Sequence, residues 1–264
     1  MKLSICHLYG DRMNIYGDDG DITTIIKRCQ WRGIETEVSL VTVGEKIDPK
    51  KFDFYFFGGG QDQQQVTVSE DLHKANGKLL KEAANSGAVM LAICGGYQLL
   101  GHYYLTAEGK KLQGAGILNI HTVASKKRMI GNISLVLTYE LEKEIKKTYF
   151  YSNPQSSILN PLTRLVGFEN HSGQTFLGSG IQPLGKIEVG FGNNGDDKTE
   201  GAWQNNVFGC YLHGSVLPKN PHFADFLISK ALEKNYGKVE LKPLDDETEW
   251  QAHFSSLARA RQTK

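Results

Sequence analysis

The segment at residues 88–100 constrains the fold most, because an uninterrupted apolar run stops there at Cys94, which is followed by two glycines. We predict a buried parallel strand over residues 88–93 and a helix over residues 96–104. A strand that turns into a helix through Cys-Gly-Gly brings the cysteine side chain out at the carboxyl edge of the sheet, since glycine tolerates the close backbone contacts beside it. The segment therefore predicts a nucleophile elbow with sulfur as the nucleophile.

The surroundings of Cys94 favour a reactive thiol. The N-terminus of the predicted helix carries a partial positive charge that favours the thiolate, and the thiolate is the nucleophilic form. The backbone N–H of Gly95 is free to hold an oxyanion. A buried, unreactive cysteine at a tight turn is the alternative, and other parts of the chain must decide between the two.

A second glycine-rich turn follows the aromatic strand predicted over residues 52–57, where Gly58, Gly59 and Gly60 stand in a row. The carboxyl ends of parallel strands meet at one edge of a sheet, so this loop is expected near Cys94. Bare backbone N–H groups suit the stabilisation of an oxyanion, and we predict Gly60 as a second donor. A plain sharp turn is the alternative.

Strands and helices alternate through the N-terminal part of the chain. Further strands are predicted over residues 3–9 and 35–43, and helices over residues 22–31 and 69–86. This order predicts an α/β fold with a doubly wound, mostly parallel sheet flanked by helices. The turn-rich loop at residues 10–21 is expected at the ligand-binding edge of that sheet, either as a plain turn or as a wall of the site.

The later elements are shorter, and the charged segment 140–148 is expected to be an exposed excursion. We predict closing helices over residues 221–236 and 244–260. The sheet is expected to continue with antiparallel additions at strand-like runs over residues 117–124, 129–137, 165–169 and 187–189.

Another buried strand is predicted over residues 207–212, and it delivers His213 at its carboxyl end, beside Gly214. A histidine at this edge is the right kind of residue to reach Cys94 as a general base. Taken alone, such a histidine is more often a hydrogen-bonded structural residue. Both readings stay open from these residues alone.

Charge and cysteine content restrict the partners. The 30 Lys and Arg residues against 29 Asp and Glu give a formal net charge of +1, which does not favour nucleic acid or an anionic membrane as the main partner. The four cysteines form no C-x-x-C pair, which argues against a zinc site or disulfide scaffold and favours a reducing cytoplasm. The apolar runs are too short for a signal peptide or a membrane span. We therefore expect a cytoplasmic protein without metal or cofactor that acts on a small molecule.

Several motifs together resemble class I glutamine amidotransferases of the cobyric acid synthase type. The residues that carry the resemblance are His7-Leu8-Tyr9-Gly10, Met13-Asn14-Ile15-Tyr16-Gly17-Asp18, Phe56-Phe57-Gly58-Gly59-Gly60-Gln61-Asp62, Leu91-Ala92-Ile93-Cys94-Gly95-Gly96-Tyr97-Gln98-Leu99-Leu100, Gly167-Phe168-Glu169-Asn170-His171 and Tyr211-Leu212-His213-Gly214. With this resemblance, we predict a glutamine amidotransferase domain over residues 1–237 and a C-terminal helical extension over residues 238–264.

The resemblance implies that Cys94 attacks the side-chain amide of glutamine while His213 moves the proton, so that ammonia leaves and water releases glutamate from a thioester. Gly60 and Gly95 would donate backbone N–H groups to the oxyanion. Arg128 would hold the glutamine, since a guanidinium pairs bidentately with the α-carboxylate. An exposed basic loop is the alternative for Arg128.

The chain departs from the usual triad of this family at Ser215, where a glutamate two residues after the histidine is expected. Either Cys94 and His213 act as a dyad, or a carboxylate comes from elsewhere. We hypothesise that a partner protein supplies it. His171 is expected to be structural.

The resemblance also implies a partner, because ammonia is mostly protonated and unreactive at neutral pH and must reach the enzyme that consumes it. The implied partner is an ATP-dependent, Mur-ligase-like subunit of the MurT type. It would activate the α-carboxyl of D-glutamate in the lipid II stem peptide for amidation to D-isoglutamine. The chain has no Walker-type phosphate loop, so ATP is expected to bind the partner in a heterodimer. The alternatives are a cobyrinate-type amidation, a catalytically idle scaffold subunit and a hydrolase that acts on peptides.

Overall fold

The computed structural model describes residues 1–149 and 161–262. Its first sheet has six strands in the order β11-β12-β4-β3-β1-β2, and neighbouring strands are parallel except for the antiparallel β11. β3 and β4 are buried along their whole length, which explains their continuous apolar sequences. The strands are β1 (Lys2–Leu8), β2 (Glu35–Val41), β3 (Phe54–Phe57), β4 (Val89–Ile93), β11 (Ala202–Gln204) and β12 (Val207–Cys210).

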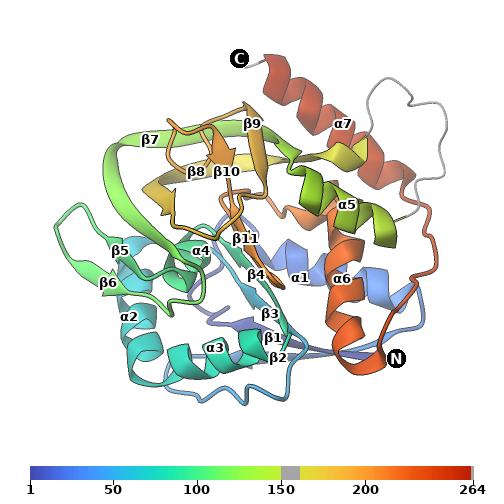
Figure 1. Ribbon diagram of the computed structural model, residues 1–264, viewed down its shortest axis with the longest axis horizontal. Helices are drawn as coiled ribbons and strands as arrows, with labels where there is room; N and C mark the ends of the chain where they lie inside the picture. Colours follow the sequence, from blue (N-terminus) through green and yellow to red (C-terminus); the bar gives the residue numbers. More distant parts are fainter. Residues whose placement is uncertain (150–160, 263–264) are drawn as a thin grey trace.

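Helices flank this sheet on both sides (Figure 1). α1 (Asp19–Gln30) and α6 (Pro221–Tyr236) lie on one side, and α2 (Asp62–Asp71) and α3 (Gly77–Asn85) lie on the other. A π-helical segment (Leu72–Asn76) joins α2 to α3, so this helical run begins earlier than the sequence predicted. The arrangement is the predicted α/β fold. None of the helices in the described ranges is long and apolar enough to cross a bilayer.

The strands between residues 103 and 200 form a second sheet, which corrects the expectation that they extend the first. Its order is β10-β9-β7-β5-β6, with β8 paired to β7. β7 and β8 form a long antiparallel ribbon, with a register shift between Ala124 and Met129. Exposed basic residues at this shift interrupt the apolar pattern, so the sequence indicated two strands where the fold has one. The members are β5 (Tyr103–Leu105), β6 (Lys111–Gln113), β7 (Ile120–Leu137), β8 (Arg164–Leu177), β9 (Gly185–Val189) and β10 (Thr199–Glu200).

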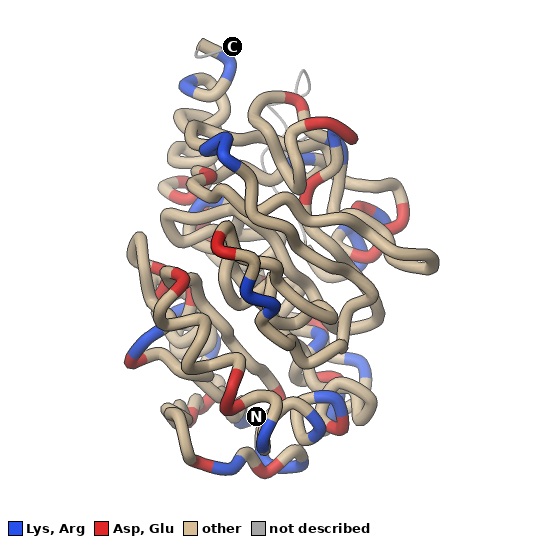
Figure 2. The backbone as a smooth tube through the Cα atoms, turned by 90° about the vertical axis from the view of Figure 1, so that its left-hand side faces the viewer, with Lys and Arg blue, Asp and Glu red and all other residues tan. Residues whose placement is uncertain are grey.

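The charged segment at residues 140–148, predicted as an exposed excursion, is helical and buries only one side. It belongs to α5 (Tyr139–Thr148), in which Leu141 and Ile145 are four residues apart and both buried. The other helices are α4 (Gly95–Leu100) and α7 (Glu247–Gln262), and short 3-10 turns occur at Pro161–Thr163 and Leu217–Lys219. Basic and acidic residues are interspersed along the backbone (Figure 2), in keeping with the net charge of +1.

A buried ion-pair network fastens the C-terminal segment to α1. Arg28 donates hydrogen bonds to both carboxylate oxygens of Asp225 on α6, at 2.6 and 2.8 Å, and to both of Asp246, at 2.6 and 2.9 Å. Arg32 donates to the same Asp225. Arg28 is only 1% exposed, so its charge depends on these carboxylates. A separate unit after residue 237 stays a prediction.

Replacing Arg28 with methionine is expected to lower the free energy of unfolding by about 3 to 5 kcal/mol, because it leaves a buried carboxylate without its partner. Urea unfolding monitored by circular dichroism measures this change. Lys27→Met, at the exposed neighbouring position on α1, is the control and should change stability by less than about 0.5 kcal/mol. Equal, small effects of both substitutions would contradict the network's role in stability.

Candidate active site

Cys94 lies where β4 runs directly into α4, at the turn that the sequence predicted. Its backbone φ is 48°, in the left-handed region that non-glycine residues rarely adopt. The Cys94 N–H donates to the Cys210 carbonyl at 2.8 Å, which ties the turn to β12. A Cβ on Gly96 would lie 2.3 Å from the Phe57 carbonyl oxygen, so glycine is required there. This strained strand-to-helix turn has the geometry of a nucleophile elbow.

The glycine loop after β3 approaches Cys94 as the sequence predicted. A Cβ on Gly95 would lie 3.0 Å from the Gly60 nitrogen, and one on Gly60 would lie 2.2 Å from the Met13 sulfur. The two backbone amides are therefore neighbours, in a space that only glycines leave open. Within the described part of the chain, neither the Gly60 nor the Gly95 N–H has a recorded acceptor. Two free, adjacent N–H groups are the donors that an oxyanion requires.

His213 follows β12 and is fully buried. Backbone hydrogen bonds in both directions with Phe168 on β8 fix its position, at 2.6 and 3.2 Å. Its Nδ1 lies 3.2 Å from the Asp18 Oδ1. Since a carboxylate only accepts hydrogen bonds, Nδ1 carries a proton here. Its Nε2 has no hydrogen-bond partner among the described residues.

Asp18 is the carboxylate that the sequence could not locate. It is fully buried, and its second oxygen accepts the Gly59 N–H at 2.8 Å. One carboxylate therefore orients both His213 and the glycine loop. The chain itself places a carboxylate against His213, so the site has an orienting carboxylate in the isolated chain; that a partner protein supplies the catalytic one stays a hypothesis. Asp18 belongs to the loop at residues 10–21, which is thus a wall of the site.

Ser215 has a different role from the glutamate expected at its position. Its hydroxyl donates to the Gly17 carbonyl at 2.6 Å, and a Cβ on Gly20 would lie 2.1 Å from the Ser215 Oγ. The small side chain fits tightly against the loop that carries Asp18. The position therefore holds the carboxylate's loop in place instead of supplying the carboxylate.

The electrostatic environment favours a charged His213. Burial by itself lowers the pKa of His213, but the neighbouring Cys94 thiolate and the hydrogen bond with Asp18 outweigh it and raise the pKa to about 10. A charged histidine beside a cysteine is the arrangement that cysteine nucleophiles use. The other cysteines differ: burial raises the pKa of the Cys29 thiol to about 12, so it stays protonated and unreactive.

A cavity of about 450 Å³ opens beside Cys94. Gly60 and Arg128 also line it, whereas Gly95 and His213 adjoin it through their contacts with Gly60 and Tyr16. Three residues that line this cavity have a buried acceptor without a hydrogen-bond partner among the described residues: Gln65 Oε1, Gln98 Oε1 and His171 Nε2. Unpaired buried acceptors are costly, so the cavity suits a ligand that carries hydrogen-bond donors.

His171 combines structural and site features. Its ring stacks on that of Tyr211 with centroids 3.5 Å apart, and its Nδ1 donates to the Gly173 carbonyl at 2.8 Å. Nε2 has no hydrogen-bond partner among the described residues and lies 3.8 Å from the Glu169 Oε2. The sequence indicated only the structural part, because stacking and orientation are invisible in a motif.

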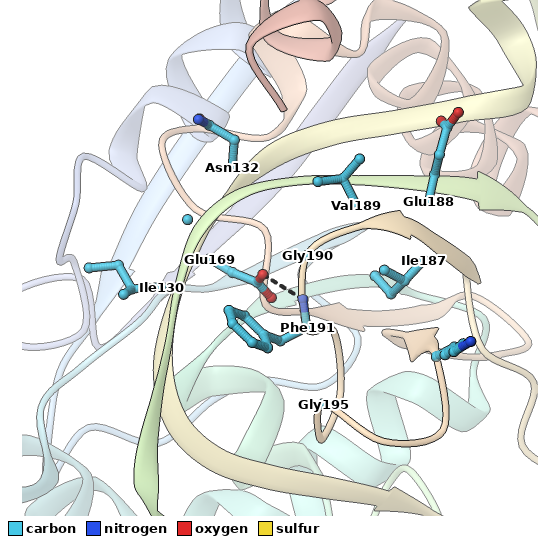
Figure 3. Close-up of a pocket in the computed structure, with 11 residues that line it drawn as sticks. Ile130, Asn132, Glu169, Ile187, Glu188, Val189, Gly190, Phe191 and Gly195 are labelled. Carbon is cyan, nitrogen blue, oxygen red and sulfur yellow. Dashed lines mark hydrogen bonds between the residues drawn. The ribbon is translucent and has the colours of Figure 1, made fainter. Parts of the chain in front are cut away.

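A second cavity, of about 760 Å³, lies between β7 and β9 (Figure 3). Glu169 lines it, but both carboxylate oxygens accept backbone N–H groups, from Phe191 at 2.7 Å and Gly192 at 2.9 Å. Glu169 therefore fixes the turn after β9. In the described ranges, no group of three or more His, Cys, Asp or Glu side chains is arranged to hold a metal ion.

The sequence profile of the CobB/CobQ-like glutamine amidotransferase domain matches residues 4–221, a span that contains every residue of this site. The chain belongs to this family. This amidotransferase is 37% identical over 247 residues to the GatD subunit of the glutamine-hydrolysing lipid II isoglutaminyl synthase of Streptococcus pneumoniae, across 93% of this chain and 86% of the relative. The GatD subunit of Staphylococcus aureus is 36% identical over 263 residues, across 100% of this chain and 98% of the relative.

A solved structure supports the fold of the amidotransferase independently. A glutamine amidotransferase from Thermotoga maritima superposes with a TM-score of 0.53 at 15% sequence identity, covering 98% of this chain and 95% of the other. At that identity the likeness concerns the fold alone, and it confirms the predicted fold class. The family predicted from the sequence motifs is confirmed by the profile and by the two relatives.

Asp21 gives this amidotransferase a pH-dependent stability. Complete burial, aided by the Asp18 charge, raises the pKa of Asp21 to about 8, against the lowering effects of the Leu217 N–H, Lys219 and His213. An acid whose pKa is raised on folding stabilises the fold at low pH, and that stability is lost as pH rises through the folded-state pKa. Between pH 7 and 9, the ionisation of Asp21 should lower the free energy of unfolding by about 1.4 kcal/mol.

Asp21→Asn is expected to remove that loss, because an amide oxygen still accepts the Leu217 N–H, which lies 2.7 Å from Oδ1, and does not ionise. Urea unfolding of both proteins at pH 7, 8 and 9 measures the difference. Burial also raises the pKa of Glu200 to about 8. Both proteins contain Glu200, so its contribution to the pH dependence cancels in the comparison. Parallel stability curves for the two proteins would contradict the prediction.

Proposed function

We propose that this amidotransferase hydrolyses L-glutamine at Cys94 and passes the ammonia to an ATP-dependent ligase subunit. The observation that carries the proposal is the buried Cys94–His213–Asp18 array beside a cavity that holds one guanidinium, Arg128. Such an array suits attack on a carboxamide by a thiolate. The two GatD relatives, each named as a subunit of a glutamine-hydrolysing synthase, support the substrate and the existence of a partner subunit.

The first half-reaction uses the imidazolium and the free amides. The Cys94 thiolate attacks the Cδ carbonyl of glutamine, and the negative charge that develops on oxygen is held by the Gly60 and Gly95 N–H groups. His213 then gives its Nε2 proton to the amide nitrogen, the C–N bond breaks and ammonia leaves. The product is a γ-glutamyl thioester on Cys94. Each oxyanion donor is worth about 3 to 4 kcal/mol in comparable sites.

The second half-reaction returns the enzyme to its starting state. Neutral His213 takes a proton from water at Nε2, and the hydroxide attacks the thioester carbonyl. The C–S bond breaks, glutamate is released and the thiolate forms again beside the imidazolium. Asp18 keeps Nδ1 protonated throughout, so that the same nitrogen, Nε2, always faces the reaction.

Arg128 gives the site its preference for an amino acid. Its guanidinium is the one Lys or Arg side chain among the residues that line the cavity in the described ranges. We assign it to the α-carboxylate of glutamine, which it can hold with two parallel hydrogen bonds. The exposed position of Arg128 at the cavity rim leaves the amide end of the substrate to the deeper Cys94.

The acceptor follows from the relatives. We assign the chain to the amidation of lipid II, with a MurT-like ligase subunit as the partner that activates the D-glutamate α-carboxyl. The two GatD relatives are matched over 86% and 98% of their own lengths, which favours a separate glutaminase subunit over a glutaminase fused to a larger synthase. This argues against a cobyrinate-type function.

The test is glutamate release from L-glutamine by the purified chain, alone and with a co-expressed MurT-like subunit. We expect release to require the L-isomer and to fail with L-asparagine, whose shorter side chain cannot span from Arg128 to Cys94. With the partner, ATP and lipid II, amidated lipid II should appear in proportion to the glutamate released. Turnover of peptides but not glutamine would favour the hydrolase alternative, and no turnover with the partner present would favour the scaffold.

A further inference from the structure

Three side chains form a closed hydrogen-bond network across the mouth of the catalytic cavity. Arg128 Nε donates to Asn170 Oδ1 at 2.7 Å, and Asn170 Nδ2 donates to the Tyr16 hydroxyl at 2.7 Å. Arg128 Nη2 lies 3.5 Å from the same hydroxyl. All three residues line the cavity. The network joins the loop at residues 10–21, which follows β1 of the first sheet, to the β7–β8 ribbon of the second sheet.

Tyr16 also covers the catalytic histidine. Its ring meets that of His213 edge-on, with centroids 5.0 Å apart. Tyr16 is 45% exposed and has a φ of 57°, so neither burial nor local backbone preference explains its position. The contacts that compensate for this strain are those with His213 and Asn170.

We propose that Tyr16 and Asn170 are positioning residues for substrate, which orient Arg128 toward the glutamine α-carboxylate and shield His213 from solvent. This inference rests on the proposed glutamine hydrolysis and adds residues that determine its specificity. Asn170 occupies the Arg128 Nε and the Tyr16 hydroxyl takes one hydrogen of Nη2, so Nη1 and the second Nη2 hydrogen remain for the substrate. The donor hydrogen of the Tyr16 hydroxyl has no recorded acceptor in the described ranges and lies beside the guanidinium, where it can reach the same carboxylate.

The network also couples the two ends of the substrate site. A carboxylate that binds Arg128 strengthens the bonds that hold Tyr16, and Tyr16 in place keeps water from His213 and from the thioester. Without Asn170, Arg128 returns to the conformational freedom of an exposed arginine and loses its orientation. Glutamine binding should therefore weaken more than the chemistry slows.

Binding of L-glutamine to the Cys94→Ala protein, measured by isothermal titration calorimetry, tests this inference without turnover. Adding Asn170→Ala should raise Kd by about 10-fold to 100-fold, the size of a lost charge-assisted hydrogen bond. Adding Tyr16→Phe should raise Kd by about 3-fold to 10-fold, since it removes only the hydroxyl. Asn132→Ala is the matched control, because Asn132 lies on the same ribbon but lines the second cavity instead of the catalytic one, and it should leave Kd unchanged.

Steady-state kinetics on the Cys94 enzyme separates positioning from mere loop stability. Asn170→Ala should raise KM for glutamine with kcat within about 3-fold, and Tyr16→Ala should in addition lower kcat and shift the pH–rate profile, whereas Tyr16→Phe should keep the profile. Unchanged Kd and KM in Asn170→Ala would overturn the inference while leaving the glutaminase intact. If Cys94→Ala binds no glutamine, the proposed function and this inference fall together; normal binding with no network effect overturns only the latter.

Discussion

Replacing Cys94 with alanine is expected to bring glutamate release from L-glutamine to background, a loss of at least about 10⁴-fold. No other thiol in the chain can substitute, because Cys94 lines the cavity whereas the other cysteines are 0% exposed and do not, and burial raises the pKa of the Cys6 and Cys29 thiols to about 12. Without the thiolate no thioester forms, and the oxyanion donors alone have no nucleophile to assist. A coupled assay for glutamate with and without the partner subunit measures the effect.

Cys29→Ala is the control for that experiment, since Cys29 lies on α1 and carries a thiol that stays protonated. It should retain full activity and full alkylation by iodoacetamide at Cys94, whereas Cys94→Ala should take up no label at neutral pH. Mass spectrometry of the labelled peptides locates the reactive sulfur. Glutamate release by Cys94→Ala at more than a few per cent of the wild-type rate would remove Cys94 from the mechanism.

Replacing Asp18 with asparagine is expected to lower kcat for glutamine hydrolysis by about 10² to 10⁴-fold, with a much smaller change in KM. The amide can present its NH₂ group to His213 Nδ1, which then becomes an acceptor, so the proton moves to the wrong nitrogen. The pKa of His213 should also fall, since Asp18 helps to raise it. Activity as a function of pH, measured on the isolated chain and on the complex, tests both effects.

Asp19→Asn is the matched control for Asp18→Asn, because Asp19 is the next residue in the chain and is largely exposed. It should leave kcat within about 2-fold of wild type. The competing hypothesis is that the partner supplies the carboxylate that orients His213. If Asp18→Asn were nearly as active as wild type once the partner is bound, the partner would supply the orienting group after all.

The sequence predicted the local parts of the site because residue type dictates local backbone geometry. An apolar run that ends in Cys94 and two glycines can hardly form anything but a buried strand and a sharp turn. The glycine loop ending at Gly60 and the strand before His213 were predicted for the same reason. The boundaries of helices were less well predicted, as at α2, where polar glutamines give no apolar periodicity.

The pairing of residues far apart in the chain was not predictable. Asp18 and His213 are 195 positions apart, and they meet because β1 and β12 both end at the same edge of a sheet whose strand order the sequence does not state. Any of the 29 acidic residues was a candidate for this contact, so a missing glutamate after the histidine suggested an external carboxylate. The Tyr16–Asn170–Arg128 network was hidden for the same reason.

The sequence by itself thus determined the α/β class and predicted Cys94 as nucleophile, His213 as base and Gly60 and Gly95 as oxyanion donors, since these predictions follow from short-range patterns in the chain. Only the tertiary structure decided which carboxylate lies against His213, how Arg128 is held and that the strands between residues 103 and 200 form a second sheet. Those features depend on distances between segments, and such distances are set by the packing of strands and helices rather than by the residues on either side of a motif.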